Sequence, residues 1–210
     1  MVRAVGSAPL TVAWLAILVA TTRRQQAAGR RGSKRIQREH STNLQKLSTE
    51  PSRVLVTSAF YLDGRSWWPY VPVFAGVVAP AERRLGSLRW LLVGALAHVG
   101  ATYVGQGHLL ARIRRGSAPR RLVNARDVGV SYVVLGLAGA LSGYVPRAWR
   151  TRTQLVVGGA LAVNAAARPT ATEVGHLSAF AIGLAVSPWV PDRDARPYPD
   201  LASLSPREQT

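Results

Sequence analysis

The sequence predicts an all-α protein, a polytopic membrane helical bundle with about six transmembrane helices. Three observations support this fold class. Apolar runs almost free of charge recur along the chain, arginine pairs separate them, and small residues repeat at four-residue spacing inside them. The chain of 210 residues is long enough for one domain with a sizeable core. We therefore expect a multi-pass protein of the cell membrane.

The apolar runs define the expected spans. A helix crosses the hydrocarbon core of about 30 Å with about 20 apolar residues. In chain order the runs are 4–22, 67–81, 88–111, 128–144, 155–167 and 174–189. The second and fifth runs are short, so polar flanks must extend them if they cross the membrane. The first run also resembles a secretory signal, which would leave five spans, but the arginine pair directly after it favours a retained anchor.

Composition divides the chain into four segments. Residues 1–22 form the first transmembrane span, 23–66 a basic loop, and 67–190 the remaining membrane core. Residues 191–210 are rich in proline and charge, so we expect a disordered tail. Within the basic loop, the apolar run 54–62 is too short to cross a membrane and indicates a re-entrant or interfacial segment.

The charge balance limits the classes of partner that the chain is expected to bind. The chain has 27 Lys and Arg against 10 Asp and Glu, a net charge of +17, which attracts nucleic acid or an anionic membrane surface. The arginines lie in short clusters between apolar runs, and no nucleic-acid-binding motif is present. We therefore expect the lipid bilayer as partner and no nucleic acid. The absence of cysteine excludes disulfides and thiolate metal sites, and without an HExxH motif we expect no metal and no cofactor.

Small residues inside the runs predict close helix packing. Such residues four apart let helix backbones approach where lipid gives no hydrophobic drive. On the third run they are Ala97, Ala101 and Gly105, and on the sixth Gly175, Ala179, Gly183 and Ser187. On the fourth run Gly139 and Gly143 form such a pair, and Gly136 lies three residues before on a neighbouring face.

A serine and a histidine in apolar runs are the candidate reactive groups. Ser131 lies on the fourth run and His176 on the sixth, and an imidazole that accepts a hydroxyl proton makes serine competent for acyl transfer. A membrane serine is more often a packing residue bonded to its own helix. We expect His98 and Asn164 to form interhelical hydrogen bonds and His108 to lie at the membrane interface.

Four motifs follow one another along the chain. They are SRVLVTSAF (52–60), APAERRLGSLRWLLV (79–93), GVSY (129–132) and EVGHLSAFAIGLA (173–185). Together they resemble the rhomboid family of intramembrane serine proteases, and more closely its divergent bacterial rhomboid-like branch. The resemblance covers about residues 4–190 and implies a rhomboid-like bundle.

This resemblance implies a specific chemistry. GVSY stands where the family has GxSG, so Ser131 would be the nucleophile and His176 its base, in a dyad without an acidic third member. The substrate would be a transmembrane protein, cut near the outer face of the membrane. Water would reach the serine through a cavity open to that side.

Several positions depart from the family pattern. Tyr132 replaces the glycine after the serine, and Leu135 replaces a tyrosine. The family's oxyanion-stabilising His and Asn fall on Ser66 and Tyr70, whose hydroxyls, with the Ser131 amide, are the expected substitutes. One oxyanion donor is worth about 2.7–4 kcal/mol in the transition state. The alternative function is therefore an inactive rhomboid-like protein that binds membrane clients, as derlins do.

Two further points stay open. The family orientation puts the amino terminus inside, which leaves more Lys and Arg outside than inside and conflicts with the positive-inside rule. We retain the family orientation because four motifs support it. A third hypothesis, a small-solute transporter or channel, rests on histidines within spans, but the chain lacks broken helices at matching positions in two halves.

Overall fold

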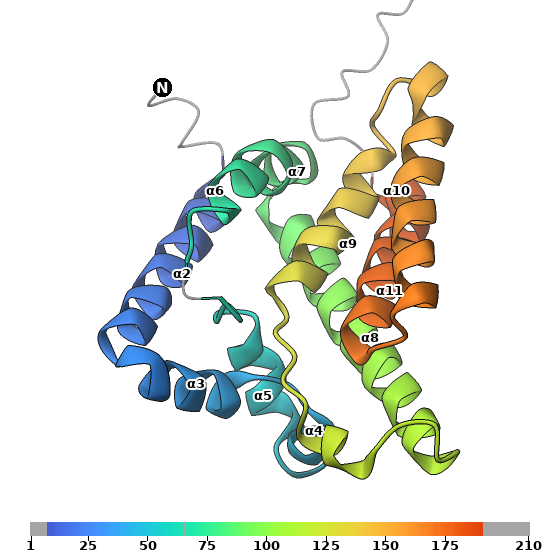
Figure 1. Ribbon diagram of the computed structural model, residues 1–210. Coiled ribbons are helices and arrows are strands. Elements are labelled where there is room, and N and C mark those ends of the chain that lie inside the picture. The colour runs from blue at the N-terminus through green and yellow to red at the C-terminus, as the bar shows by residue number, and fades with distance from the viewer. Residues whose placement is uncertain (1–7, 65, 191–210) are drawn as a thin grey trace, which may run out of the picture.

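A computed structural model describes residues 8–64 and 66–190 of the chain (Figure 1). Helices dominate this part, and its residues form no β-strand beyond one isolated bridge between Thr42 and Asp127. The all-α prediction is confirmed. None of the helices in this part is both long enough and apolar enough to cross a membrane. The predicted disordered tail, 191–210, and the start of the first predicted span lie outside the described residues.

The first two helices of the described residues meet at a sharp turn. Helix α2 (Pro9–Ala27) begins with proline in its first turn, where no helical amide partner is needed, and runs past the arginine pair that closed the predicted span. Gly29 then adopts φ of +67°, a conformation that side chains disfavour, and α3 (Gly29–His40) leaves at a steep angle to α2 (Figure 1).

Two short helices follow in the basic loop. Asn43 accepts a hydrogen bond from the Lys46 amide and so caps α4 (Leu44–Thr49). Helix α5 (Pro51–Ser58) contains the first half of the apolar run predicted as an interfacial segment. Its residue Val54 is buried, whereas Val56 is exposed.

The second predicted span is an irregular helix. It consists of α6 (Tyr70–Val73), a π-helical segment η1 (Phe74–Val78) and α7 (Ala79–Leu85). Pro80 lacks an amide hydrogen, and the widened π turn lies directly before it. Gly86, at φ of +76°, then turns the chain into the long helix α8 (Ser87–Arg114).

The carboxyl-terminal half completes the bundle. Its elements are η2 (Arg120–Asn124), α9 (Val130–Ser142), α10 (Arg147–Ala167), α11 (Ala171–Val186) and η3 (Ser187–Trp189). Polar residues lengthen the helix that contains the fifth apolar run, because α10 begins at Arg147, eight positions before that run.

Helices α8, α9 and α11 pack against one another through the predicted small residues. A side chain at Gly139 would collide with the Phe180 carbonyl oxygen of α11, and one at Gly183 with the Gly136 carbonyl oxygen of α9. Gly136 likewise leaves room for Ala97 of α8. The three helices thus approach to backbone contact, as the four-residue spacing predicted.

One carboxylate fixes the amino end of α2 to the rest of the bundle. Glu82 is 1% exposed and accepts hydrogen bonds from the Leu10 and Thr11 amides at 3.0 and 2.7 Å. It also accepts from the hydroxyls of Thr11 at 2.6 Å and Ser87 at 2.7 Å. Because the α2 amides have no acceptor within their own helix, Glu82 serves as their cap from another helix.

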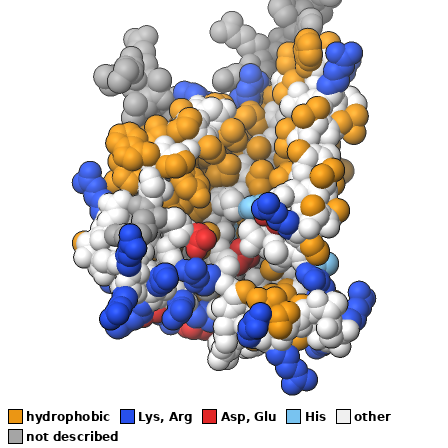
Figure 2. Space-filling model, in the orientation of Figure 1, with side chains coloured by type: hydrophobic (Ala, Val, Ile, Leu, Met, Phe, Trp, Pro, Cys, Tyr) orange, Lys and Arg blue, Asp and Glu red, His pale blue; other side chains and the backbone are white. Residues whose placement is uncertain are grey.

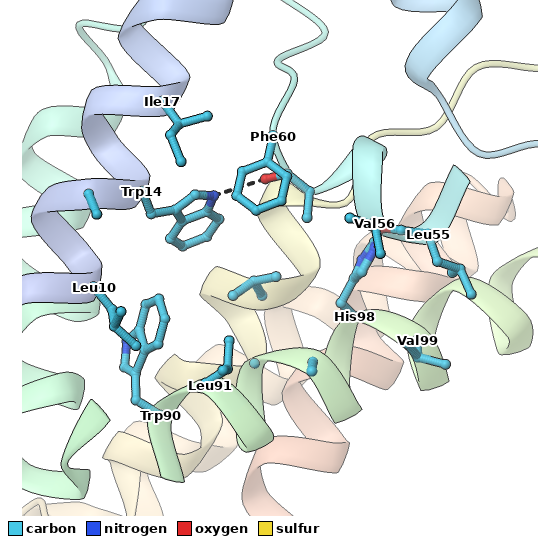
Figure 3. Close-up of a pocket in the computed structure, with 15 residues that line it drawn as sticks. Leu10, Trp14, Ile17, Leu55, Val56, Phe60, Trp90, Leu91, His98 and Val99 are labelled. Carbon is cyan, nitrogen blue, oxygen red and sulfur yellow. Dashed lines mark hydrogen bonds between the residues drawn. The ribbon is translucent and has the colours of Figure 1, made fainter. Parts of the chain in front are cut away.

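An apolar groove of about 450 Å³ lies between α2, α5 and α8 (Figure 3). Trp14 and Ile17 of α2, Phe60 and residues of α8 line it, and the Trp14 indole donates to the Ala59 carbonyl at 2.9 Å. At its α5 end, the His98 Nε2 lies 2.8 Å from the Leu55 carbonyl oxygen, which joins α8 to α5. His98 therefore makes the interhelical hydrogen bond that the sequence predicted.

Candidate active site

Ser131 and His176 meet at corresponding ends of two neighbouring helices. Ser131 is the second residue of α9, and His176 lies in the second turn of α11. The His176 Nε2 lies 2.9 Å from the Ser131 Oγ, and both residues are half-buried. This distance lies within hydrogen-bond reach for a nucleophile and its base. Helix packing thus brings together two residues that stand 45 positions apart.

A carboxylate lies on the other side of the imidazole. Glu173, one turn before His176 on α11, has its Oε2 3.3 Å from the His176 Nδ1. Asn164 of α10 donates its side-chain amide to the same oxygen, and the Thr170 hydroxyl accepts from the Glu173 amide and caps α11. With Nδ1 protonated, His176 donates to Glu173 and leaves Nε2 free to accept the Ser131 hydroxyl proton.

Tyr132, which departs from the family pattern, is held by another carboxylate, that of the buried Asp127. It is fully buried, and its hydroxyl donates to the Asp127 Oδ2 at 2.6 Å. Gln106 and Thr172 also donate to Asp127, at 3.4 and 3.2 Å. Asp127 precedes α9, outside the predicted spans, and burial raises the pKa of its carboxyl, an effect that these donors oppose. The network joins α8, α9 and α11 beside the site.

Two glycines leave space for the rings of Tyr132 and His98. A side chain at Gly175 would press on the Tyr132 ring, which lies edge-on to the His176 ring with centroids 5.6 Å apart. A side chain at Gly129 would collide with the His98 ring. Tyr132 is larger than the glycine that the family has at this position, and it fits because α11 has Gly175 opposite its ring.

The predicted oxyanion-assisting side chains are not joined to the dyad. Ser66 is exposed before α6, and Tyr70 begins α6 and packs against the apolar core. Among the described residues, neither hydroxyl bonds to Ser131 or His176. The backbone supplies other donors, because the first amides of α9 have no acceptor within the helix. Val130 and Ser131 carry two of these amides.

Sequence reasoning missed the arrangement around the imidazole. Glu173 stands three positions before His176, and this spacing places both residues on one helix face. The sequence therefore contained a signal for the contact between Glu173 and His176. The contact of Tyr132 with Asp127 spans the turn that starts α9, which residue spacing alone does not reveal. In the part of the chain that the structure describes, no three side chains group as a metal site would require.

Comparison with known proteins identifies the family of the chain. The model of a family described as rhomboid-like protein matches residues 3–196, nearly the whole chain. No curated protein and no solved structure matches the chain.

Proposed function

Because the chain belongs to the rhomboid-like family and is therefore a membrane protein, we propose that it is an intramembrane serine endopeptidase. Ser131 attacks a peptide bond of a transmembrane substrate, and His176 takes up the hydroxyl proton. The observation that carries the proposal is the 2.9 Å between the Ser131 Oγ and the His176 Nε2. Both residues are half-buried, so each keeps part of its surface accessible.

The chemistry proceeds by acyl transfer. As the Ser131 oxygen bonds to the substrate carbonyl carbon, His176 Nε2 accepts its proton and later gives it to the leaving amine. The carbonyl oxygen becomes an oxyanion next to the first amides of α9, where the helix dipole favours negative charge. Water then hydrolyses the acyl-enzyme, with His176 acting as base again.

Glu173 is the positioning residue in this proposal. Its carboxylate accepts a hydrogen bond from the protonated Nδ1 and so holds His176 in the tautomer that presents Nε2 to Ser131. The hydrogen bond from Asn164 keeps the carboxylate in place. The resemblance implied a dyad without an acidic member, so Glu173 extends the expected site.

Cleavage of a model transmembrane substrate by the purified protein tests the nucleophile. We expect Ser131→Ala to abolish cleavage. Ser178→Ala is the matched control, because Ser178 bonds to the Val174 carbonyl within α11 and has no part in the reaction. Cleavage by Ser131→Ala at the wild-type rate would refute the assignment.

A second candidate function, client binding without cleavage, rests on the apolar groove and on the positions of Ser66 and Tyr70. The groove is open along α2 and α8, where exposed Leu91 lies on its wall (Figure 3). A photo-crosslinker at Leu91 would then capture a model transmembrane peptide, whereas one at Val163, exposed on α10, would not. Capture without any cleavage would favour this second function.

A further inference from the structure

Helix α3 presents its basic side chains at the end of the bundle where α2 stops. Arg30, Arg31, Lys34, Arg35 and Arg38 are all exposed on this helix. Figure 2 shows Lys and Arg gathered over the α3 end of the molecule, beyond the zone where hydrophobic side chains cover the face. Because α3 lies across the end of α2 (Figure 1), this basic surface stands where a membrane protein meets lipid headgroups.

A polar hollow of about 510 Å³ opens beside α3. Arg30, Lys34 and Ser33 line it from α3, and Arg126 lines it from the segment before α9. Asp63 is also in the lining, so three cations face one carboxylate. Among the described residues, neither Arg30 nor Lys34 pairs with a carboxylate, and their charge is therefore available to a ligand.

Neighbouring side chains hold Arg126 in place at the hollow. Its guanidinium donates to the Gln37 Oε1 at 2.6 Å and lies 3.9 Å from the Asp63 carboxylate. Gln37 in turn is only 4% exposed and donates to the Leu62 and Asp63 carbonyls. The guanidinium is thus held at the hollow by residues from α3 and from the loop after α5.

An unpartnered hydroxyl lies at the same place. Ser33, 2% exposed, lines the hollow, and its Oγ has no hydrogen-bond partner among the described residues. A buried polar group without a partner is costly, and an acceptor such as a phosphate oxygen would satisfy it if the side chain turned toward the hollow.

From this arrangement we infer that the hollow between α3 and Arg126 binds the phosphate of an anionic phospholipid headgroup, such as phosphatidylglycerol. Arginine and lysine side chains are the groups that bind phosphate most readily. The phosphate offsets the excess positive charge, and the lipid chains extend toward the apolar zone beside α2.

Headgroup binding would also affect the segment that leads to the candidate active site. Arg126 directly precedes Asp127, whose backbone pairs with Thr42 at 2.8 and 3.1 Å and whose side chain holds Tyr132. A lipid on Arg126 therefore stabilises the segment that leads into α9 and Ser131. This effect does not depend on whether the protein cleaves substrates.

Thermal unfolding of the full chain in detergent, titrated with short-chain phosphatidylglycerol, phosphatidylcholine or inorganic phosphate, tests the inference. We expect phosphatidylglycerol to stabilise more than either of the others. Arg30→Gln with Lys34→Gln should weaken its apparent Kd about 30-fold, since each interfacial basic residue contributes roughly a factor of five. Arg126→Gln, which removes the charge contributed by the segment before α9, should weaken it as well.

Arg114→Gln with Arg115→Gln is the matched control, because it removes the same charge from exposed residues at the end of α8, outside the hollow. The control should keep the wild-type response. Equal loss in the control would mean diffuse attraction and would overturn the site. An unchanged response in the Arg30 and Lys34 variant, or equal stabilisation by inorganic phosphate alone, would overturn it as well.

Discussion

At the scale of single residues, Glu173 lies where the orienting carboxylate of a serine hydrolase would lie. Its oxygen is 3.3 Å from the His176 Nδ1, and its side chain is about one-fifth exposed, so water competes for the contact only in part. Its backbone amide is bound to Thr170, and therefore a change of side chain leaves the helix cap in place.

We expect Glu173→Leu to slow serine-directed labelling of Ser131 by at least about tenfold, up to the roughly 10⁴-fold known when a triad carboxylate is lost. Glu173→Gln keeps an oxygen that can accept a hydrogen bond from the protonated Nδ1 and should lose less. The ¹⁵N shifts of His176 report the tautomer directly, and they should show the Nδ1-protonated form in wild type and a mixture in Glu173→Leu. Identical spectra in the two proteins would contradict the positioning role.

Glu82 is a second residue whose role can be isolated. Its carboxylate accepts four hydrogen bonds, and hydrogen bonds to charged groups are worth about 1.5–3 kcal/mol each. Glu82→Gln keeps the shape but removes the charge and turns one acceptor into a donor. We expect a loss of about 2 kcal/mol or more, measured by thermal unfolding in detergent. Glu39→Gln, which breaks only an exposed pair with Arg35, should change stability by less than about 1 kcal/mol.

At the scale of helices, the contact of α9 with α11 sets the distance between Ser131 and His176. Gly139 and Gly183 are at the closest approach, and each would place a Cβ against backbone of the other helix. Backbone cannot move aside as a flexible side chain can. The dyad geometry therefore depends on glycines that have no chemical role of their own.

Gly183→Ala should destabilise the protein by about 1–3 kcal/mol through overpacking and should slow labelling of Ser131 by moving α11. Gly107→Ala is the matched control on α8, since a Cβ there meets no described atom within 4 Å. Alanine favours helix by up to about 1 kcal/mol over glycine, so the control should be neutral or more stable. Thermal unfolding of both variants checks this, and equal stability of the two would contradict the packing account.

At the scale of the whole molecule, the sequence predicted the helical architecture and the small-residue packing, and it singled out Ser131 and His176 as candidate reactive groups. Hydropathy could not place the start of α10, because Arg147 and the polar residues after it are helical without being apolar. It also gave no sign of the steep turn at Gly29, which depends on one backbone angle. The number of spans and the membrane orientation stay predictions.

The sequence could predict some of the residues of the candidate site but not the distances between them. Ser131 and His176 stand in motifs that resemble those of a family, whereas their distance depends on how α8, α9 and α11 pack. Ser66 lies before α6, which begins only at Tyr70, so the Ser66 side chain is exposed and apart from Ser131 and His176. Tyr132 and Asp127 meet through a turn whose geometry the sequence does not express.

Labelling with a fluorophosphonate probe tests the central claim most directly. The probe transfers its phosphonyl group to an activated serine oxygen and releases fluoride, so it reports activation of Ser131 by His176 without a known substrate. We predict labelling of the wild-type protein in membranes, at Ser131, and its loss in both Ser131→Ala and His176→Ala. Wild-type protein that is folded yet unlabelled, or labelling that persists without His176, would contradict the account.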